Sequence, residues 1–566
     1  MKPRVRLALI GSDQQDNLAV GYLAAAAADA GVEVVQIRFD SAAFLDECVE
    51  AVLAAGVEVV GLSIRFQASI RDHLELARAL RRRGYEGHIT CGGHPPTFCY
   101  REILRDAPEI DSVIRHEGEA TLVELLERLR DEDERGLAGV TGTVWRDGSA
   151  VVVEPARPLE RELERIRPPA RRESPMTIGA VRVAFVITSR GCTGDCRYCS
   201  IRAFGRDAGG PAYRLRSADA VADEVATLYH RDGVRVFFVQ DDLFILPNEA
   251  ATLSRLGGLT AALRRRGVDE ARFWIKGRPE SITPAVLDAA SELGTVHLFI
   301  GLESASSSQL VRLGRTHVPA DNERALELCR EREILPSFNF MLFDPDGTLD
   351  DVSASLDLAS RNLDLPWNVC RTEVYPGTRL KQSLHEQGRL EGDYASHGYR
   401  MADEHAEVMF RVMRVCFHDR AFDFDSLLNR LIALSFARQT QQAFFAGART
   451  DALAREVDEL MIAVHADTVD RMRRYVDFAA STRLEEVDPI RRFAVAEGLE
   501  VSSVDVAWRG QYRELWRRAN LFGATLTPPP SRRRRQGAAP PDPTGAASSS
   551  SASSCEQRWR GRSGGA

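Results

Sequence analysis

The sequence predicts an α/β protein in which two consecutive strand–helix series are followed by a helical region. Over the first 150 residues, short apolar runs alternate with helix-like stretches, which is typical of a doubly wound, Rossmann-like parallel sheet. From residue 181 a second series of six strand–helix units begins, and it predicts a partial (β/α)6 barrel of the TIM type. After about residue 380 the strand signals fade and amphipathic helices dominate.

The first series contains short apolar runs that we interpret as buried strands. The predicted strands are 4–11, 32–39, 57–64, 87–93 and 111–119, and the predicted helices are 17–31, 44–56, 70–84 and 121–131. Ligands of such a sheet bind at the carboxyl ends of its strands, so we expect the functional residues of this domain at those ends.

The second series repeats the pattern with longer helices between its strands, and a barrel of this type again carries its function at the carboxyl ends of the strands. The predicted strands are 183–189, 234–242, 272–278, 296–304, 336–344 and 368–378. Two long amphipathic helices are predicted further on, at 427–447 and 455–480.

These patterns divide the 566-residue chain into five segments. Pro, Arg and Glu are abundant between the two series, which indicates an extended linker, and the low-complexity sequence from Thr527 onward predicts disorder. The predicted segments are a first domain (1–150), a linker (151–180), a barrel (181–380), a helical C-terminal region (381–526) and a disordered tail (527–566).

Composition narrows the functional class. The formal net charge of −8 argues against a nucleic-acid binder, which usually carries a basic domain. The sequence contains no run of about 18 uncharged apolar residues, so no membrane span is predicted. The N-terminal apolar run is too short for a signal peptide. We therefore expect a cytoplasmic protein with reduced thiols, in which clustered cysteines favour metal binding or catalysis over disulfides.

Three of the ten cysteines lie within eight residues, as Cys192-x3-Cys196-x2-Cys199. Structural zinc requires four protein ligands, and the next cysteine, Cys329, is about 130 residues away. His230 could complete a zinc site only through the fold. The alternative is a metal centre with three thiolate ligands, whose fourth position stays open to a substrate or cofactor.

The cysteine pattern resembles the signature of the radical SAM superfamily. Tyr198 supplies the aromatic residue before the last cysteine, and the motif follows the first strand of the second series, where that family places it. The resemblance implies a [4Fe–4S] cluster held by Cys192, Cys196 and Cys199. It also implies that the open iron binds S-adenosylmethionine (SAM), whose one-electron cleavage yields a 5′-deoxyadenosyl radical.

Polar residues at later strand ends of the barrel are candidates for SAM binding. Gln240, Asp241 and Asp242 end the second strand, where acids suit the SAM ammonium, although Asp also suits a helix N-cap. The family often has GGEP there, and this chain has no glycine pair. The other candidates are Tyr198 near the adenine, the cations Lys276 and Arg278, which could equally be a solvated pair, and Glu303 and Ser304 in the segment GLES.

A doubly wound domain before such a barrel resembles the cobalamin-binding radical SAM proteins. The candidate cobalamin contacts at the strand ends are Ser12, Ser63, Gly92, Gly93 and Glu119; glycines allow close backbone approach, and Glu119 could instead begin a helix. The motif D-x-H-x-x-G, whose His binds cobalt in many cobalamin proteins, is absent, and Leu18 stands in the place of the His. A degenerate domain without cobalamin is the alternative.

These resemblances imply a cobalamin-dependent radical SAM methyltransferase. The enzyme would place a methyl group from methylcobalamin on an unactivated carbon of a small-molecule, specialised-metabolite or lipid intermediate. No acid–base residue is assigned, because that chemistry does not require one. An external electron donor such as flavodoxin or ferredoxin is expected. The alternatives are a cobalamin-type radical SAM enzyme without methyl transfer, such as an oxidative cyclase or a ring-rearranging enzyme, and a cobalamin or redox sensor.

Overall fold

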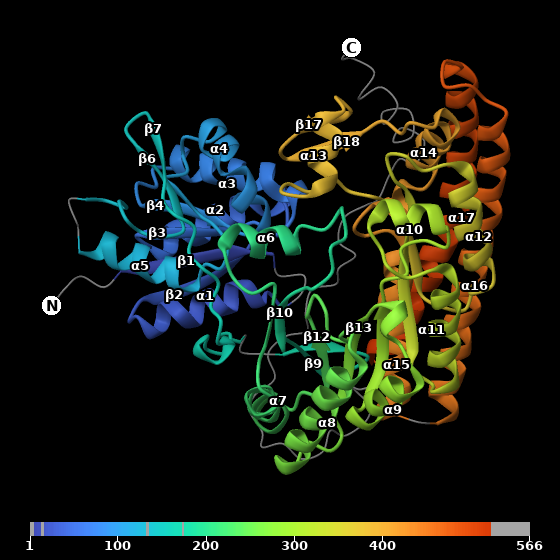
Figure 1. Cartoon of the computed structure of the whole chain (residues 1–566), viewed down its shortest axis with the longest axis horizontal. Coiled ribbons are helices and arrows are strands. Elements are labelled where there is room, and N and C mark those ends of the chain that lie inside the picture. The colour runs from blue at the N-terminus through green and yellow to red at the C-terminus, as the bar shows by residue number, and fades with distance from the viewer. Residues whose placement is uncertain (1–4, 13–15, 132–134, 172–174, 446, 522–566) are drawn as a thin grey trace.

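The computed structural model describes residues 5–12, 16–131, 135–171, 175–445 and 447–521. The predicted tail, 527–566, lies outside the described residues. The chain forms three parts that follow one another across Figure 1: an α/β domain, a curled sheet with its helices, and a bundle of long helices. Among the residues described, no helix is long and apolar enough to cross a membrane.

The first domain is a doubly wound sheet, as predicted, with strand order β2-β1-β3-β4-β5-β6-β7. Strands β1 to β5 are parallel. Helices α2, α3 and α4 cover one face through an apolar core, and α1 and α5 cover the other. The elements are β1 (Arg6–Gly11), α1 (Leu18–Asp29), β2 (Glu33–Arg38), α2 (Leu45–Ala55), β3 (Val59–Ser63), α3 (Ile70–Arg82), β4 (His88–Gly92), α4 (His94–Asp106), β5 (Ser112–Ile114) and α5 (Glu119–Arg130).

A hairpin extends this sheet beyond the predicted strands. Strands β6 (Thr143–Asp147) and β7 (Ala150–Val153) add to it in antiparallel fashion. They are joined by the two-residue loop Gly148-Ser149, where Gly148 has a φ of 57°. A Gly-Ser pair between two strand-like runs is a hairpin signal, so this element was readable in the sequence.

The second part contains the six parallel strands that the sequence predicts. Its sheet has the order β16-β15-β14-β13-β12-β9-β8, with β8 antiparallel at one edge, and it curls into a half-barrel. The strands are β8 (Met176–Ile178), β9 (Val181–Val186), β12 (Val236–Val239), β13 (Arg272–Gly277), β14 (Thr295–Ile300), β15 (Leu335–Phe343) and β16 (Trp367–Arg371). The helices are α7 (Ala218–Asp232), α8 (Glu249–Arg265), α9 (Pro284–Leu293), α10 (Ser307–Leu313), α11 (Pro319–Glu331) and α12 (Leu349–Ser360).

A small excursion between β9 and α7 carries the cysteine motif. Strand β10 (Ser189–Gly191) leads into the cysteines, α6 (Ile201–Ala208) follows them, and β11 (Tyr213–Leu215) pairs back onto β10. The segment 192–200, which we call the cluster loop, is therefore held between a two-stranded ribbon and a helix. In Figure 1, α6 lies between the first domain and the barrel.

The C-terminal region is helical, as predicted. Its helices are α14 (Glu404–Cys416), α15 (Leu427–Phe444), α16 (Ala448–Ala480) and α17 (Val487–Leu521). Helix α15 contacts both β16 and β8, the two edge strands of the curled sheet, and so spans the open side of the half-barrel. Inside the sheet, Phe436 of α15 packs on Trp274, with ring centroids 4.4 Å apart.

Sequence patterns did not predict the hairpin that follows α13 (Arg379–Glu386). It consists of β17 (Leu390–Asp393) and β18 (Ser396–Tyr399). Ala395 at its tip joins the apolar core of the first domain, and Gln67 donates a hydrogen bond to the Tyr394 carbonyl at 2.9 Å. The hairpin therefore ties the barrel to the first domain.

The segment predicted as a linker makes a second tie. Arg171 donates hydrogen bonds to Asp16 of the first domain and to the Phe185 carbonyl of the barrel, both at 2.7 Å. The Ala170 amide donates to the Gly21 carbonyl at 2.9 Å. These contacts fix how the two domains face each other, which decides where their strand ends meet.

Candidate active site

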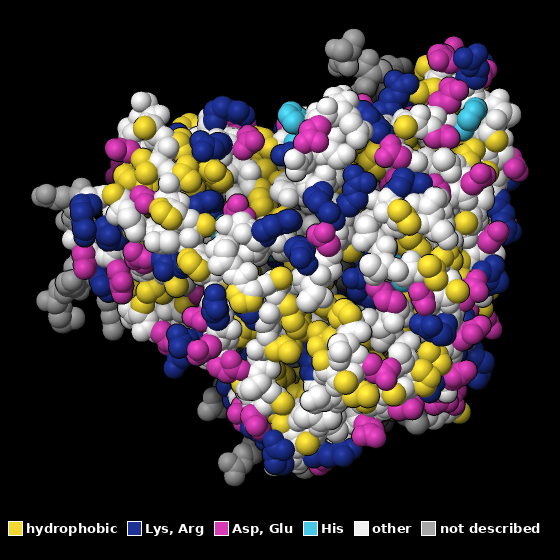
Figure 2. Space-filling view, in the orientation of Figure 1, with side chains coloured by type: hydrophobic (Ala, Val, Ile, Leu, Met, Phe, Trp, Pro, Cys, Tyr) yellow, Lys and Arg dark blue, Asp and Glu magenta, His cyan; other side chains and the backbone are white. Residues whose placement is uncertain are grey.

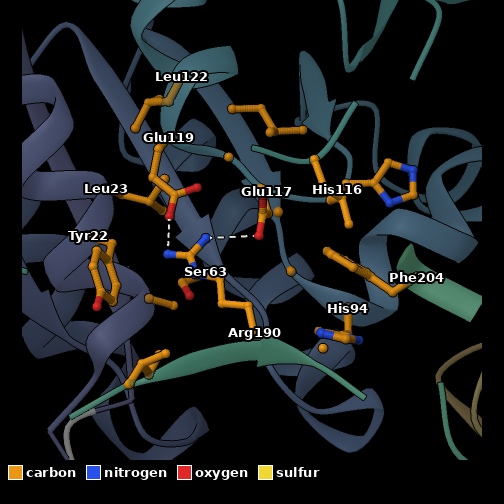
Figure 3. A pocket seen from close by; sticks show the side chains of 18 of the residues that line it. Tyr22, Leu23, Ser63, His94, His116, Glu117, Glu119, Leu122, Arg190 and Phe204 are labelled. Carbon is orange, nitrogen blue, oxygen red and sulfur yellow. Dashed lines mark hydrogen bonds and ion pairs between the residues drawn. The ribbon is translucent and has the colours of Figure 1, made fainter. Parts of the chain in front are cut away.

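A cavity of about 320 Å³ lies between the first domain and the barrel (Figure 3). Its size is within the range of roughly 300–1,000 Å³ that small-molecule and cofactor pockets have. The first domain contributes strand ends of its sheet, and the barrel contributes β10, α6 and the end of β12. The cavity therefore lies where both halves of the sequence predicted function.

Four of the five predicted cobalamin contacts line this cavity: Ser63, Gly92, Gly93 and Glu119. Ser12 is not part of its lining. Its hydroxyl instead donates a hydrogen bond to Asp40 at 2.8 Å, so the structure gives Ser12 a role within the first domain.

Backbone forms much of the cavity wall, because six of its lining residues are glycines: Gly61, Gly92, Gly93, Gly118, Gly191 and Gly205. Gly93 has a φ of 125°, and a Cβ there would lie 2.1 Å from the Ile64 carbonyl oxygen. Only glycine fits this position. The resulting smooth, largely apolar wall suits a large flat ligand such as a corrin ring, and the first domain therefore fits cobalamin.

Charged groups in the wall neutralise one another across the two domains. Arg190 of β10 donates to Glu117 at 3.0 Å and to Glu119 at 2.6 Å, and its guanidinium lies 4.8 Å from the Tyr22 ring (Figure 3). Arg214 also donates to Glu117, at 2.9 and 3.0 Å. Burial alone would raise the pKa of Glu117, but the hydrogen bonds and charges of Arg214 and Arg190 lower it.

An aromatic group forms the opposite side of the cavity (Figure 3). The His94 ring stacks on Phe204 of α6 at 4.2 Å, and His116 meets Phe204 edge-on at 5.0 Å. Burial, with a smaller contribution from His116, lowers the pKa of His94 to about 4, so His94 is neutral at physiological pH. His94 Nδ1 lies 3.4 Å from the hydroxyl of Ser200, the residue after Cys199. The cavity wall thus adjoins the cluster loop.

The three predicted metal ligands share the cluster loop, and all three are free thiols. The sulfurs of Cys192 and Cys196 lie 3.3 and 3.9 Å from the point where a Cβ of Gly194 would stand. The described residues contain no group of three His, Cys, Asp or Glu side chains arranged for one metal ion. A [4Fe–4S] cluster takes one thiolate on each iron, so its cysteine ligands need not converge on a single ion.

Arg315 contacts the cluster loop and was not predicted from the sequence. Its Nη1 donates to the Cys196 sulfur at 3.5 Å, its Nη2 donates to the Gly301 carbonyl at 2.6 Å, and Glu303 lies 3.7 Å away. The Arg315 side chain is only 5% exposed. Burial alone would lower its pKa, but Glu303 and nearby groups raise it, so Arg315 is a permanent cation beside a cysteine ligand.

Gln240, Asp242 and Lys276 form the polar end of the cavity region. Gln240 and Asp242 line the cavity, and Lys276 donates to the Gln240 side-chain oxygen at 3.2 Å. Burial raises the pKa of Asp242 to about 6, while the Lys276 charge opposes that rise. Burial lowers the pKa of Lys276, which Asp242 opposes. A carboxylate and an amide oxygen here suit a cationic amino group.

Two predicted SAM contacts point elsewhere. Asp241 is buried, and its carboxylate accepts hydrogen bonds from the backbone and hydroxyls of Thr188 and Ser189 and from Arg255, at 2.5 to 3.1 Å. Its acceptor sites are therefore taken within the protein. Ser304 is also fully buried, and its hydroxyl accepts from the Ser306 amide at 2.9 Å. In this structure both residues shape the fold around the site.

The remaining predicted contacts surround the cluster loop. Arg278 reaches within 3.0 Å of the Gly194 Cβ position and pairs with Glu280 at 3.0 Å. Glu303 has a φ of 64°, which is uncommon for a residue with a side chain. Burial, followed by the Glu303 charge, raises the pKa of Tyr198. Each of these residues lies near the cysteines, and their contact with SAM stays a prediction.

Comparison with known proteins gives a family match for each half of this site. Residues 3–126 match the B12 binding domain family, and residues 186–359 match the radical SAM superfamily. The first match contains the glycine-lined strand ends, and the second contains the cluster loop. Together they assign cobalamin, SAM and a [4Fe–4S] cluster as the cofactors of the chain.

Three named proteins are similar to this chain over more than half of its length. An uncharacterised methyltransferase of Pyrococcus horikoshii is 27% identical over 328 residues, covering 57% of this chain and 68% of that protein. The anaerobic magnesium-protoporphyrin IX monomethyl ester cyclase of Cereibacter sphaeroides is 28% identical, covering 54% of this chain and 50% of the cyclase. The hopanoid C-3 methylase of Methylococcus capsulatus is 24% identical, covering 63% of this chain and 65% of the methylase.

Solved structures share the fold. The cobalamin-dependent SAM radical enzyme OxsB, bound to aqua-cobalamin and SAM, has a TM-score of 0.64 at 16% identity, covering 92% of this chain and 85% of OxsB. The radical SAM methyltransferase TsrM of Kitasatospora setae, bound to cobalamin and a [4Fe–4S] cluster, has a TM-score of 0.56 at 21% identity, covering 68% of this chain and 78% of TsrM.

Proposed function

We propose that this chain, a radical SAM protein with a B12-binding domain, is a cobalamin-dependent methyltransferase that methylates an unactivated carbon of a small-molecule intermediate. One observation carries the proposal: the glycine-lined strand ends of the first domain and Gln240 and Asp242 of the barrel line the same cavity. A methyl carrier and a radical generator can therefore act on one substrate carbon.

The chain's own residues supply the framework for this chemistry. When bound, the cluster and SAM supply a 5′-deoxyadenosyl radical, and cobalamin supplies a methyl group. Cys192, Cys196 and Cys199 would hold the cluster, and Gln240 and Asp242 would accept hydrogen bonds from the SAM amino group. Asp241 positions that pair by fastening the end of β12 to Thr188 and Ser189.

The first domain holds its cofactor by shape more than by charge. Gly92 and Gly93 let a large ring approach the backbone, and Arg190, paired with Glu117 and Glu119, presents no uncompensated charge to it. The hairpin β17–β18 and Arg171 keep the two domains in fixed relation. A fixed relation keeps the methyl donor and the radical at a constant separation, which pre-organises the reaction.

The substrate proposed is a specialised-metabolite or lipid intermediate, and the relationship to a hopanoid methylase supports the lipid class. The external electron donor is a flavodoxin or ferredoxin. A cytoplasmic location belongs to the proposal because the three cysteines must remain reduced to hold a cluster. We keep the proposed segment boundaries at residues 150, 180, 380 and 526, with two adjustments from the sheets: β7 extends the first sheet to Val153, and β8 begins the barrel sheet at Met176.

A radical reaction without methyl transfer is the second candidate, and the relationship to the magnesium-protoporphyrin ester cyclases favours it. The two candidates differ in what happens to SAM. Methyl transfer consumes one SAM as methyl donor and one as radical source, whereas cyclisation needs only the radical source.

Anaerobic turnover separates them. The reconstituted protein would be incubated with methyl-labelled SAM, reductant and a metabolite and lipid extract. We expect 5′-deoxyadenosine, S-adenosylhomocysteine and one labelled product besides the methionine that SAM cleavage releases. Formation of 5′-deoxyadenosine without S-adenosylhomocysteine, and with label in methionine alone, would contradict methyl transfer and support the cyclase-type alternative.

A further inference from the structure

The cluster loop reaches the protein surface on one side. Thr193 and Asp195 of the loop are exposed. Its other sides are covered: Ser200 contacts His94 at the cavity, and Cys196 contacts the buried Arg315 of the barrel. An electron that enters the cluster from outside the protein therefore has its shortest approach at the exposed side of the loop.

Four arginines lie in the cluster loop or on the elements beside it, and we call them the basic rim: Arg197, Arg202, Arg206 and Arg379. Arg202 donates to the Thr193 carbonyl at 2.8 Å and lies 3.6 Å from Asp195. Arg379 of α13 pairs with the same Asp195 at 3.0 Å. Figure 2 shows Lys and Arg side chains gathered across the middle of this face, over the region between α6 and α13. Arg197 belongs to the cluster loop, Arg202 and Arg379 contact it, and Arg206 lies one helical turn beyond Arg202 on α6.

The basic rim keeps a surplus of positive charge. Asp195 lies between Arg202 and Arg379, and Asp207 beside Arg206 pairs with His116 at 2.9 Å. Among the residues that the structure describes, Arg206 forms no ion pair and is exposed, and Arg197 bonds only a carbonyl and a hydroxyl. The whole chain carries a formal net charge of −8, so this positive area contrasts with its surroundings.

We propose that the basic rim is the docking surface for an acidic one-electron carrier protein. In this encounter the carrier loses one electron, and the cluster behind the loop gains it. Weak redox complexes have small interfaces and rely on electrostatic steering for fast association. On a negatively charged protein, a positive area over the cluster loop orients an acidic carrier toward the cluster. The inference rests on the proposed function, because a radical SAM cluster needs an external electron.

Stopped-flow reduction of the reconstituted cluster tests the proposal without SAM or substrate. The probe is a purified acidic flavodoxin in its fully reduced form, and cluster bleaching is followed at low and high salt. Arg206→Glu should lower the second-order rate constant about tenfold at low salt, and high salt should slow the native protein toward the variant. Arg206→Lys should restore the rate, because it restores the charge.

Two controls separate docking from damage. Arg264→Glu, which reverses an exposed arginine on α8 outside the rim, should leave the flavodoxin rate unchanged. Reduction by dithionite should be equally fast in all variants. The proposal would be overturned if neither Arg206→Glu nor salt changed the rate of reduction by flavodoxin, or if Arg264→Glu lowered that rate as much as Arg206→Glu does. It would also be overturned if Arg206→Glu slowed reduction by dithionite as much as reduction by flavodoxin. Absence of methyl transfer together with a slowed flavodoxin rate would instead contradict the proposed function and leave the docking surface intact.

Discussion

The two walls of the cavity differ in how they are built. The first domain offers backbone and glycines to the cavity. The barrel offers arginines that pair with Glu117 and Glu119 and a carboxylate with a raised pKa, and it holds its three cysteines in the adjoining cluster loop. The first arrangement selects a ligand by the shape of its backbone, because a Cβ at Gly93 would strike the Ile64 carbonyl and displace the wall. The second selects by charge and coordination. A different kind of substitution should therefore abolish ligand binding at each wall.

The largest expected effect is on the barrel wall. Cys196→Ala removes one of three cluster ligands, and we expect loss of bound iron and at least about a 10³-fold loss of 5′-deoxyadenosine formation. Cobalamin content should stay near that of the native protein, because the first domain is untouched. Iron analysis and visible spectra measure both. Loss of cobalamin along with iron would show that the two walls are not independent.

Substituting one glycine should weaken cobalamin binding at the wall that the first domain forms. Gly93→Ala places a Cβ against the Ile64 carbonyl at a φ of 125°, and strain of this kind costs about 1–3 kcal/mol. We expect the affinity for cobalamin to fall by about tenfold to a hundredfold while iron content is retained.

Gly31→Ala is the matched control for that change. Gly31 has a φ of 78°, and no atom lies within 4 Å of its Cβ position. This variant should share the backbone strain and keep cobalamin affinity, as measured by equilibrium binding. Equal loss of affinity in both variants would mean that strain in the domain, and not the shape of the wall, controls binding.

A smaller effect is expected at Arg315, which donates to the Cys196 sulfur. Hydrogen bonds to cluster ligands and nearby positive charge favour the reduced, more negative cluster. Arg315→Met should therefore lower the reduction potential with iron content unchanged, making reduction about tenfold less favourable. Arg315→Lys should recover part of the shift. A redox titration monitored by EPR measures this shift. An unchanged reduction potential would mean that Arg315 contributes only packing.

The smallest effect concerns Asp242, whose pKa burial raises to about 6. Its carboxylate form is a minority at pH 5 and predominates at pH 7. If that form accepts the SAM amino group, SAM affinity should rise by at most about tenfold from pH 5 to pH 7. Asp242→Asn should bind SAM with little pH dependence over this range. Calorimetric titrations at several pH values measure it, and an identical slope in the variant would contradict the assignment.

The sequence indicated the cluster loop more readily than the pairs that form across the domain interface, because residues close in sequence are also close in space. Cys192, Cys196 and Cys199 lie in one loop, so their short spacing along the chain already indicates that they lie close together in space. Arg190 and Glu117 are far apart in sequence and meet only through domain packing, and nothing local signals their pairing. Arg315 was missed for the same reason.

Strand-end position alone proved an incomplete guide to which side chains face a ligand. Gln240 and Asp242 line the cavity, but Asp241 between them turns inward to Thr188, as the alternation of a strand end dictates. Ser12 bonds Asp40 instead of lining the cavity. The hairpin at residues 390–399 was missed because its pairing buries few apolar residues of its own.

The most direct measurement of the central claim, that two differently built walls form one active site, is the anaerobic crystal structure of the fully loaded protein. We predict cobalamin against Gly92 and Gly93, and SAM on the cluster with its amino group at Asp242, both open to the same cavity. Cobalamin bound away from these glycines, or a protein segment separating it from SAM, would contradict the account.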